Sequence, residues 1–358
     1  MANNSNHNSN YNKKTTQRSC GLITGALGFV GRHLARSLIL GGQPVIGVGK
    51  HPAGAELPAQ VGPFALQGPA AELPGAVNYV CDVGTMWYLP MALEDAAPIA
   101  DLMAKLRPST VYHLAAQSSA AVSFREPVET FNSNVLGTLN LLEALRGTKA
   151  GERPVLLAVG SCEEYGPQPA ADFPLPEEAA LGPISPYGVS KVSQTLLCRQ
   201  YAQSYDLPVI LTRSFSHTGP GHDARFAFPS FARQIAAAEA GKGPTEIKTG
   251  DLSAVRDFLD VRDVIAAYRI LTKEGRPGEI YNVSSGKSMT IQEGLEILIS
   301  GATCPITLKK DPARCRPSDL PIMVGDNTKL KTETGWDPEW DFTATLLGLL
   351  DEARKEYQ

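Results

Sequence analysis

The sequence has few cysteines, and none of them lie in a paired motif. The six cysteines are scattered along the chain, and no two form a Cys-x-x-Cys pair. This spacing argues against a disulfide framework and against a structural zinc site. We therefore expect no metal centre, and we expect a reducing compartment, that is, a cytoplasmic location.

The chain also lacks excess positive charge and long apolar runs. Its formal net charge is -4 over 358 residues, which excludes bulk nucleic-acid binding and a polybasic membrane anchor. No apolar stretch is long enough to span a bilayer. A hydrophobic content of 43% is ordinary for a globular protein, and the length allows one large domain or two lobes.

Two segments have little hydrophobic patterning. Residues 1–18 are rich in Asn, Ser and Lys and lack the apolar core of a secretory signal, which predicts a disordered tail. Residues 52–76 are rich in Ala, Pro and Gly, which predicts an irregular surface insertion without catalytic residues.

Between these segments and residue 215, short apolar strands alternate with amphipathic helices. This alternation predicts an α/β fold, a Rossmann-like doubly wound parallel sheet with right-handed crossovers. We expect the Rossmann domain to cover 19–215, with further strand and helix segments returning from about 244–275. A smaller mixed lobe that binds substrate is expected mainly in 216–358.

A glycine-rich turn follows the strand predicted over residues 20–24. Gly25, Gly28 and Gly31 give the spacing G-x-x-G-x-x-G, with Phe29 and Val30 between the last two, and a helix follows. Glycines at such a turn allow close approach of a pyrophosphate, and the helix N-terminus offers N–H groups to it. The context favours a dinucleotide site over a purely structural turn.

The end of the second predicted strand bears on cofactor choice. Folds selective for NAD usually carry an acidic residue here, whereas this chain has Gly49-Lys50. Lys50 could neutralise a 2′-phosphate, which favours NADP(H) over NAD(H); the alternative is a solvated loop lysine. A third strand is predicted over residues 78–81, and Asp82 with Val83 would then meet the adenine, unless Asp82 only caps the loop.

Small residues follow the fourth predicted strand. Leu114, Ala115 and Ala116 would let the chain pass close under the cofactor, with Gln117 and Ser118 next. A long helix is predicted over residues 130–145. Asn134 lies inside it, where it could bond the backbone or water, or simply lie on a solvated face.

Tyr187 and Lys191 are four residues apart on a predicted helix, so they share one face. A neighbouring ammonium favours the phenolate and should lower the Tyr187 pKa from about 10, which would allow proton exchange with a substrate. Ser161 closely follows a strand predicted over residues 154–159. Because ligands of parallel sheets bind at the carboxyl ends of strands, Ser161 should meet Tyr187.

The C-terminal part contains a local group of arginines. Arg256, Arg314 and Arg316 are the best candidates for binding a second diphosphate. Solvated surface arginines are an equally good interpretation of the pattern alone.

Together these residues resemble the extended short-chain dehydrogenase/reductase family that acts on nucleotide sugars, also called the NAD-dependent epimerase/dehydratase family. The resemblance rests on the glycine turn, Asp82, Ala115-Ala116, Asn134, Ser161, Tyr187 and Lys191. Within the family the chain most resembles reductases that convert GDP-4-keto-6-deoxy-D-mannose to GDP-D-rhamnose. The runs FAFPSFARQI (226–235) and GDLSAVRDFLDVRD (250–263) support this.

The resemblance implies an NADPH-dependent oxidoreductase of deoxysugar biosynthesis. Tyr187 would donate the proton, Ser161 would hold the carbonyl oxygen, Lys191 would bind the nicotinamide ribose, and Asn134 would support a water relay. The resemblance also implies a homodimer through a four-helix bundle built from the Asn134 and Tyr187 helices. The further positions it implies are Ser214 at the cofactor and Gln117, Ser118, Cys162, Glu163, Ser216, Arg233, Arg256 and Arg316 at the substrate.

Three other functions stay open. A GDP-mannose 4,6-dehydratase would use Glu163 as its base, since Glu163 stands where those enzymes carry theirs. An epimerase could use the same Ser–Tyr–Lys set with no net consumption of NADPH. A non-catalytic NADP sensor or scaffold would have no need of all three catalytic positions.

Overall fold

The computed structural model describes residues 20–50, 60–71, 73–314 and 320–357. The predicted tail, residues 52–59 of the predicted insertion, and Arg316 lie outside the described residues.

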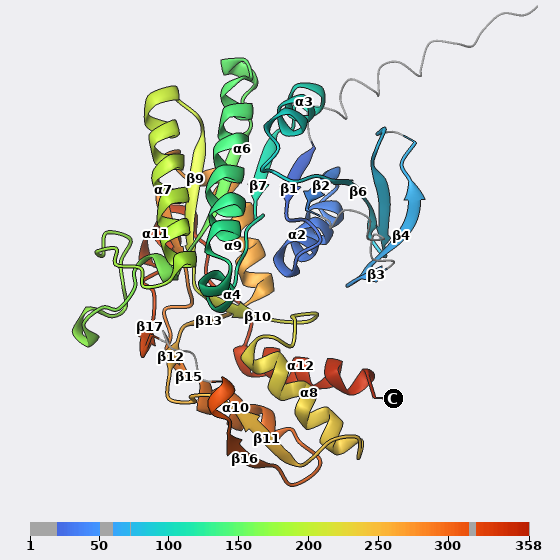
Figure 1. Cartoon of the computed structure of the whole chain (residues 1–358), viewed down its shortest axis with the longest axis vertical. Helices are drawn as coiled ribbons and strands as arrows, with labels where there is room; N and C mark the ends of the chain where they lie inside the picture. Colours follow the sequence, from blue (N-terminus) through green and yellow to red (C-terminus); the bar gives the residue numbers. More distant parts are fainter. Residues whose placement is uncertain (1–19, 51–59, 72, 315–319, 358) are drawn as a thin grey trace, which may run out of the picture.

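A ten-stranded sheet forms the centre of the larger part of the molecule (Figure 1). Seven neighbouring strands are parallel, from β14 to β6, as the alternating pattern predicted. The α/β, doubly wound fold is therefore confirmed. In sheet order the strands are β14 (Ile280–Val283), β9 (Val209–Ser214), β8 (Val155–Ser161), β7 (Thr110–His113), β1 (Gly21–Thr24), β2 (Val45–Gly49), β6 (Gly84–Pro90), β5 (Val77–Cys81), β4 (Phe64–Pro69) and β3 (Gln60–Val61).

The strand next to β2 differs from the sequence prediction. It is β6, which pairs in parallel with β2, whereas the predicted third strand corresponds to β5 and is antiparallel to β6. The prediction of irregular structure is also wrong for the second half of the predicted insertion. There, β3 and β4 extend the same edge of the sheet as antiparallel strands. The antiparallel strands β4 and β5 precede the parallel strand β6, and no local sequence signal distinguishes β5 from β6.

Helices cover both faces of the sheet, and each face has its own apolar core. One core packs around Leu34, Leu38 and Tyr268, and the other around Ile99, Leu141 and Tyr201. The first face carries α2 (Phe29–Leu40), α9 (Val261–Glu274) and α11 (Thr328–Thr334), and the second carries α3 (Ala96–Leu106), α6 (Gly137–Arg146) and α7 (Pro186–Tyr205).

The helix predicted over residues 130–145 is interrupted. It consists of α5 (Pro127–Phe131), a π-helical turn η1 (Asn132–Leu136) and α6. Single π turns inside helices are often found at functional sites. This turn contains Asn134, whose side chain is fully buried rather than on a solvated face.

The C-terminal lobe lies beyond the carboxyl edge of the sheet (Figure 1). Its core is formed by α8 (Ala227–Glu239), α10 (Ile291–Ser300) and α12 (Phe342–Lys355). Three small sheets complete it: β10 (Ser216–Thr218) with β13 (Phe258–Asp260), β11 (Glu246–Thr249) with β16 (Thr307–Lys310), and β12 (Val255–Arg256) between β15 (Met289–Thr290) and β17 (Ile322–Met323).

The chain returns from this lobe to the large sheet through α9 and β14, which lie within the C-terminal half. The division into two domains at the predicted boundaries stays a prediction. Among the described residues, no helix combines the length and the apolar character needed to cross a bilayer.

Candidate active site

The glycine turn lies at the carboxyl end of β1 and is closely packed. Gly25 has a φ of +72°, in the left-handed region that favours glycine. A Cβ on Gly25 would lie 2.9 Å from the Ala115 backbone N, and one on Gly31 would lie 2.3 Å from the Gly25 carbonyl oxygen. The turn therefore requires glycine at both positions.

The N-terminus of α2 fits an anionic group. Its cap is Gly28, no side chain caps the helix, and no acidic residue lies in its first turn. The N–H groups of this turn and the positive end of the helix dipole therefore stay available to a phosphate. The residues present fit the pyrophosphate of a dinucleotide. Phe29 begins the helix and stacks on His222 at 4.1 Å between ring centroids.

Asp82 and Val83 do not fit the predicted adenine site. They form the turn between β5 and β6, beside the amino end of β2, whereas the glycine turn lies at the carboxyl edge. Asp82 instead accepts a hydrogen bond of 3.0 Å from Arg36 Nε, and this guanidinium lowers the pKa of the Asp82 carboxyl. The prediction of a cofactor role for these two residues is wrong, because β6 rather than β5 is the parallel strand.

Lys50 directly follows β2 at the carboxyl edge of the sheet, and its ammonium is paired with carboxylates. It forms ion pairs with Glu94, at 3.3 Å, and with Glu129. The hydrogen bond from Lys50 to Glu129 is the main cause of the raised pKa of Lys50.

Ser161 and Tyr187 meet, as the topology predicted. Ser161 is the last residue of β8, and Tyr187 lies in the first turn of α7, which begins at Pro186 behind the capping residue Ser185. The two residues are 8% and 9% exposed, and they lie close enough for Ser161 to lower the pKa of Tyr187. Ser214, at the paired position on β9, bonds the Tyr268 hydroxyl at 2.7 Å.

The pKa of Tyr187 is raised, contrary to the prediction that Lys191 would lower it. Burial is the main cause; the nearby Ser161 hydroxyl lowers the pKa, while the charge of Glu163 raises it further. The Tyr187 hydroxyl is therefore protonated at neutral pH, which suits a proton donor.

Lys191 is buried below Tyr187 on the same helix. Its ammonium donates to the Val159 carbonyl oxygen at 2.8 Å and to Gln194 Oε1 at 2.9 Å, and burial lowers its pKa to about 8. Burial, with a smaller effect of Lys191, lowers the pKa of His113 to about 3. His113 is thus a neutral ring that bonds Thr24 at 2.8 Å and Thr138 at 2.9 Å.

Asn134 fastens the loop after β7 to α7. Its Oδ1 accepts from the Gln117 backbone N at 2.8 Å, and its Nδ2 donates to the Gln117 carbonyl oxygen at 3.1 Å and to Ser190 Oγ at 2.9 Å. These bonds use both amide N–H groups, so the side chain has a positioning role. The loop that it holds, Leu114 to Ser118, passes beside the glycine turn, where Ala115 N bonds Thr24 Oγ1 at 3.1 Å.

Glu163 lies beside the Ser161–Tyr187 pair. Its backbone N donates to Ser161 Oγ at 3.2 Å, and its carboxylate accepts from Ser185 Oγ at 3.1 Å. Both Glu163 and Cys162 are half-buried. Burial raises the pKa of the Cys162 thiol, and Arg256 is close enough to oppose this shift.

The predicted substrate arginines have different surroundings. Arg256 lies on β12, is half-buried and is near Cys162, so it stays a candidate. Arg233 instead bonds Glu356 at 2.8 Å on the outer surface of α8 and α12, which argues against its predicted role. Arg314 bonds Ser230 at 3.2 Å. Ser216 begins β10, half-buried, at the entrance to the lobe.

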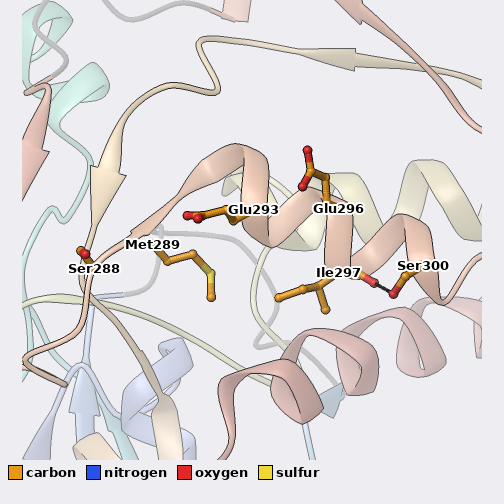
Figure 2. Close-up of a pocket in the computed structure, with 6 residues that line it drawn as sticks. All are labelled: Ser288, Met289, Glu293, Glu296, Ile297 and Ser300. Atoms are coloured by element: carbon orange, nitrogen blue, oxygen red, sulfur yellow. Dashed lines mark hydrogen bonds between the residues drawn. The ribbon is translucent and has the colours of Figure 1, made fainter.

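A surface groove of about 450 Å³ runs along α10 (Figure 2). It is lined by Ser288, Met289, Glu293, Glu296, Ile297 and Ser300. The two carboxylates and the absence of a cationic residue in this lining make it unsuitable for a diphosphate.

Sequence reasoning missed a buried ion pair behind Ser161. Glu164 is fully buried, accepts the Ser161 backbone N–H at 3.0 Å, and pairs with Arg213 Nε at 3.0 Å. Ser161 and Glu164 form a capping box around the short helix η3 (Cys162–Glu164). The S-x-x-E spacing of Ser161 to Glu164 was the available signal for this arrangement. Among the described residues, no His, Cys, Asp and Glu cluster could hold a metal ion.

Comparisons with known proteins show the family to which the chain belongs. The family described as GDP-mannose 4,6 dehydratase matches residues 22–347. A GDP-6-deoxy-D-mannose reductase from Pseudomonas aeruginosa is 36% identical over 279 residues, which cover 76% of this chain and 91% of that protein. A GDP-mannose 4,6-dehydratase from Sinorhizobium fredii is 28% identical over 69% of this chain and 75% of its own length.

Solved structures show the same fold. RMD from Pseudomonas aeruginosa, complexed with NADPH, has a TM-score of 0.75 and 31% identity, over 94% of this chain and 99% of that one. UDP-glucose 4-epimerase from Thermotoga maritima, with UDP-glucose, has a TM-score of 0.77 and 26% identity, over 94% and 99% of the two chains. The resemblance inferred from the sequence is confirmed: the chain belongs to the GDP-mannose 4,6-dehydratase family of extended short-chain dehydrogenases/reductases.

Proposed function

We propose that this protein reduces the C4 ketone of GDP-4-keto-6-deoxy-D-mannose with NADPH and forms GDP-D-rhamnose. The observation that carries the proposal is the buried pair of Ser161, at the carboxyl end of β8, and Tyr187, in the first turn of α7, which lie close enough for Ser161 to lower the Tyr187 pKa, with Lys191 one turn further along α7. The similarity to the Pseudomonas reductase and to its NADPH complex supports this substrate and this cofactor.

Tyr187 and Ser161 would each act on the sugar C4 oxygen, in different roles. Bound NADPH would supply the hydride that reduces C4. Tyr187, whose phenol is protonated at neutral pH, would give its proton to the developing alkoxide. Ser161 would hydrogen-bond the same oxygen and stabilise its charge. Asn134 would keep the loop after β7 fixed against α7, and its predicted water relay stays a prediction.

Lys191 would act from the far side of Tyr187. Its ammonium is buried, which strengthens its electrostatic effect on groups nearby. A cation there favours the phenolate that remains after proton transfer. Its predicted bond to the nicotinamide ribose stays part of this proposal.

A dehydratase is the second candidate, favoured by the family match and by the position of Glu163. Its backbone N donates to Ser161 Oγ at 3.2 Å and its carboxylate accepts from Ser185, the cap of α7, so it lies beside the site where a substrate would bind. An epimerase would need no net reductant and stays a third alternative.

The experiment offers GDP-4-keto-6-deoxy-D-mannose with NADPH and follows product configuration by NMR and NADPH by absorbance. We expect one NADPH oxidised for each molecule of GDP-D-rhamnose formed. The control is GDP-mannose without added reductant, which should be recovered unchanged. Conversion of GDP-mannose to a 4-keto sugar would establish the dehydratase instead, and C4 epimerisation without NADPH loss would establish the epimerase.

We also propose a homodimer. Apolar side chains are exposed along α4 (Ala120–Arg125), α5, η1 and α7, where a second copy would cover them. Burying such a surface against an identical one is the usual way in which soluble oligomers form. The side chains that make up this surface are Phe124, Val128, Phe131, Leu136, Val189 and Leu196.

The dimer is checked by light scattering at micromolar concentration. We expect twice the chain mass of 38.3 kDa, and we expect Leu196→Glu with Val128→Glu to shift the protein to the monomer. A matched control is Leu308→Glu, an exposed apolar residue on β16 away from this surface. A monomeric unmodified protein would contradict the proposal. The cytoplasmic location expected from the unpaired cysteines is likewise a proposal.

A further inference from the structure

The end of β2 carries one cation held between two carboxylates. Lys50 is bonded to Glu94 at 3.3 Å and to Glu129. It lies at the edge where a dinucleotide would bind, because Gly25 N of the glycine turn bonds Val48 O, two residues before Lys50, at 2.7 Å. In folds of this type the adenosine ribose lies beyond the end of this strand.

The two carboxylates are held differently. Glu94 follows β6, its side chain is 19% exposed, and it accepts a hydrogen bond from Ser133 Oγ at 2.8 Å. Its backbone carbonyl oxygen also accepts from Asn140 Nδ2 at 2.9 Å, so the whole residue is fixed against α6. Glu129 lies on the short helix α5 with 47% of its side chain exposed. Glu129 is therefore the partner that can be displaced from Lys50.

We propose that Glu129 is a specificity-determining residue for the cofactor, because its carboxylate competes with the 2′-phosphate of NADPH for Lys50. This inference rests on the proposed use of NADPH. A phosphomonoester carries about -1.5 to -2 charges at neutral pH. Lys50 with two carboxylates sums to a charge of -1, so the phosphate meets net repulsion until Glu129 turns away. NADH has a hydroxyl at this position and does not meet that repulsion.

Glu129 therefore limits the preference for NADPH that Lys50 creates. Removing the Glu129 charge should strengthen NADPH binding and leave NADH binding unchanged. Removing the Lys50 charge should weaken NADPH binding selectively. If both carboxylate and phosphate compete for the same ammonium, the benefit of removing Glu129 must shrink when Lys50 is absent.

The test measures dissociation constants for NADPH and NADH from nicotinamide fluorescence, without any sugar nucleotide. For Glu129→Gln we expect NADPH to bind roughly three- to tenfold more tightly, because the variant removes one negative charge near a solvent-exposed phosphate. We expect NADH binding to stay unchanged within about twofold. For Lys50→Met we expect about tenfold weaker NADPH binding. The double variant should show a smaller gain from Glu129→Gln than the single variant shows.

The matched control is Glu126→Gln, which removes the same charge from an exposed residue three positions earlier that is not among the Lys50 partners in the described part of the chain. It should leave both constants unchanged. Unaltered or weaker NADPH binding by Glu129→Gln would overturn the inference, and so would an equal gain with and without Lys50. A wild-type protein that prefers NADH counts against the proposed function, whereas an equal response of both cofactors to Glu129→Gln counts against this inference alone.

Discussion

Replacing Tyr187 by Phe is expected to lower the rate of ketosugar reduction by about 10²–10⁴-fold, because the substitution removes the proton donor and leaves the ring in place. Tyr187 is buried beside Ser161, so phenylalanine fills the same space without the hydroxyl. The loss should appear in kcat more than in KM, since the proton is transferred in the transition state. Steady-state NADPH oxidation with the GDP-linked 4-keto sugar measures both constants.

Glu163→Gln is the matched comparison, because Glu163 lies beside the same pair. In a reductase no carbon acid is deprotonated, so Glu163 only positions substrate and the variant should keep most of the activity. In a dehydratase a base must remove the proton at sugar C5, and loss of that base typically costs about 10²–10⁴-fold.

Deuterated solvent separates the two mechanisms independently of the variants. We expect no deuterium at C5 of the product. If Glu163→Gln is as damaging as Tyr187→Phe and deuterium appears at C5, the reductase proposal is wrong and the dehydratase takes its place.

The parts of the site that the sequence predicted correctly depend on local rules. The glycine turn needs only a strand before it and a helix after it, and Ser161 meets Tyr187 because strand ends of a parallel sheet share one edge. The start of α7 in the structure also follows local rules, since Ser185 caps the helix and Pro186 occupies its first position.

The parts that failed depend on partners far away in the sequence. Asp82 was misplaced because the strand predicted before it is the antiparallel β5. The strand that lies parallel to β2 is β6, which begins only after Asp82. Arg233 is held by Glu356, 123 residues later, and no local pattern announces that pair. The direction of the Tyr187 pKa shift was wrong because burial raises the pKa and the extent of burial is a property of the fold. Lys191, whose ammonium donates to Val159 and Gln194, is not among the groups that lower it.

The ion pair behind Ser161 leads to the second large effect, which concerns stability. Arg213 is 3% exposed and has three contacts: Glu164 at 3.0 Å, the Glu177 carbonyl oxygen at 2.7 Å and the Tyr165 ring, whose centroid lies 4.7 Å from the guanidinium carbon. Arg213→Met keeps most of the volume and removes the charge. The Glu164 carboxylate then stays buried without its cation, which typically costs about 3–5 kcal/mol of unfolding free energy.

The sign of the pH dependence follows from the same carboxylate. Burial raises the pKa of Glu164, and Arg213 opposes this shift. In Arg213→Met the folded-state pKa rises further above the unfolded value. Below the pKa of Glu164 in the unfolded state, the carboxyl is protonated in both states, so the buried charge causes no loss of stability. The loss of stability grows as the pH rises from there toward the pKa of Glu164 in the folded state. The difference in unfolding free energy between Arg213→Met and the wild type should therefore be largest at neutral pH and small near pH 4.

Urea denaturation at pH 7 and near pH 4 measures both effects, and Arg233→Met is the matched control. It breaks an ion pair whose two side chains are 43% and 45% exposed, where about 0–1 kcal/mol is typical. Adding Glu164→Gln to Arg213→Met should recover part of the loss, because the unpaired charge is then gone. If Arg213→Met is no more destabilising than Arg233→Met, the pair does not hold η3 against β9, and the position of Ser161 must depend on the capping box alone.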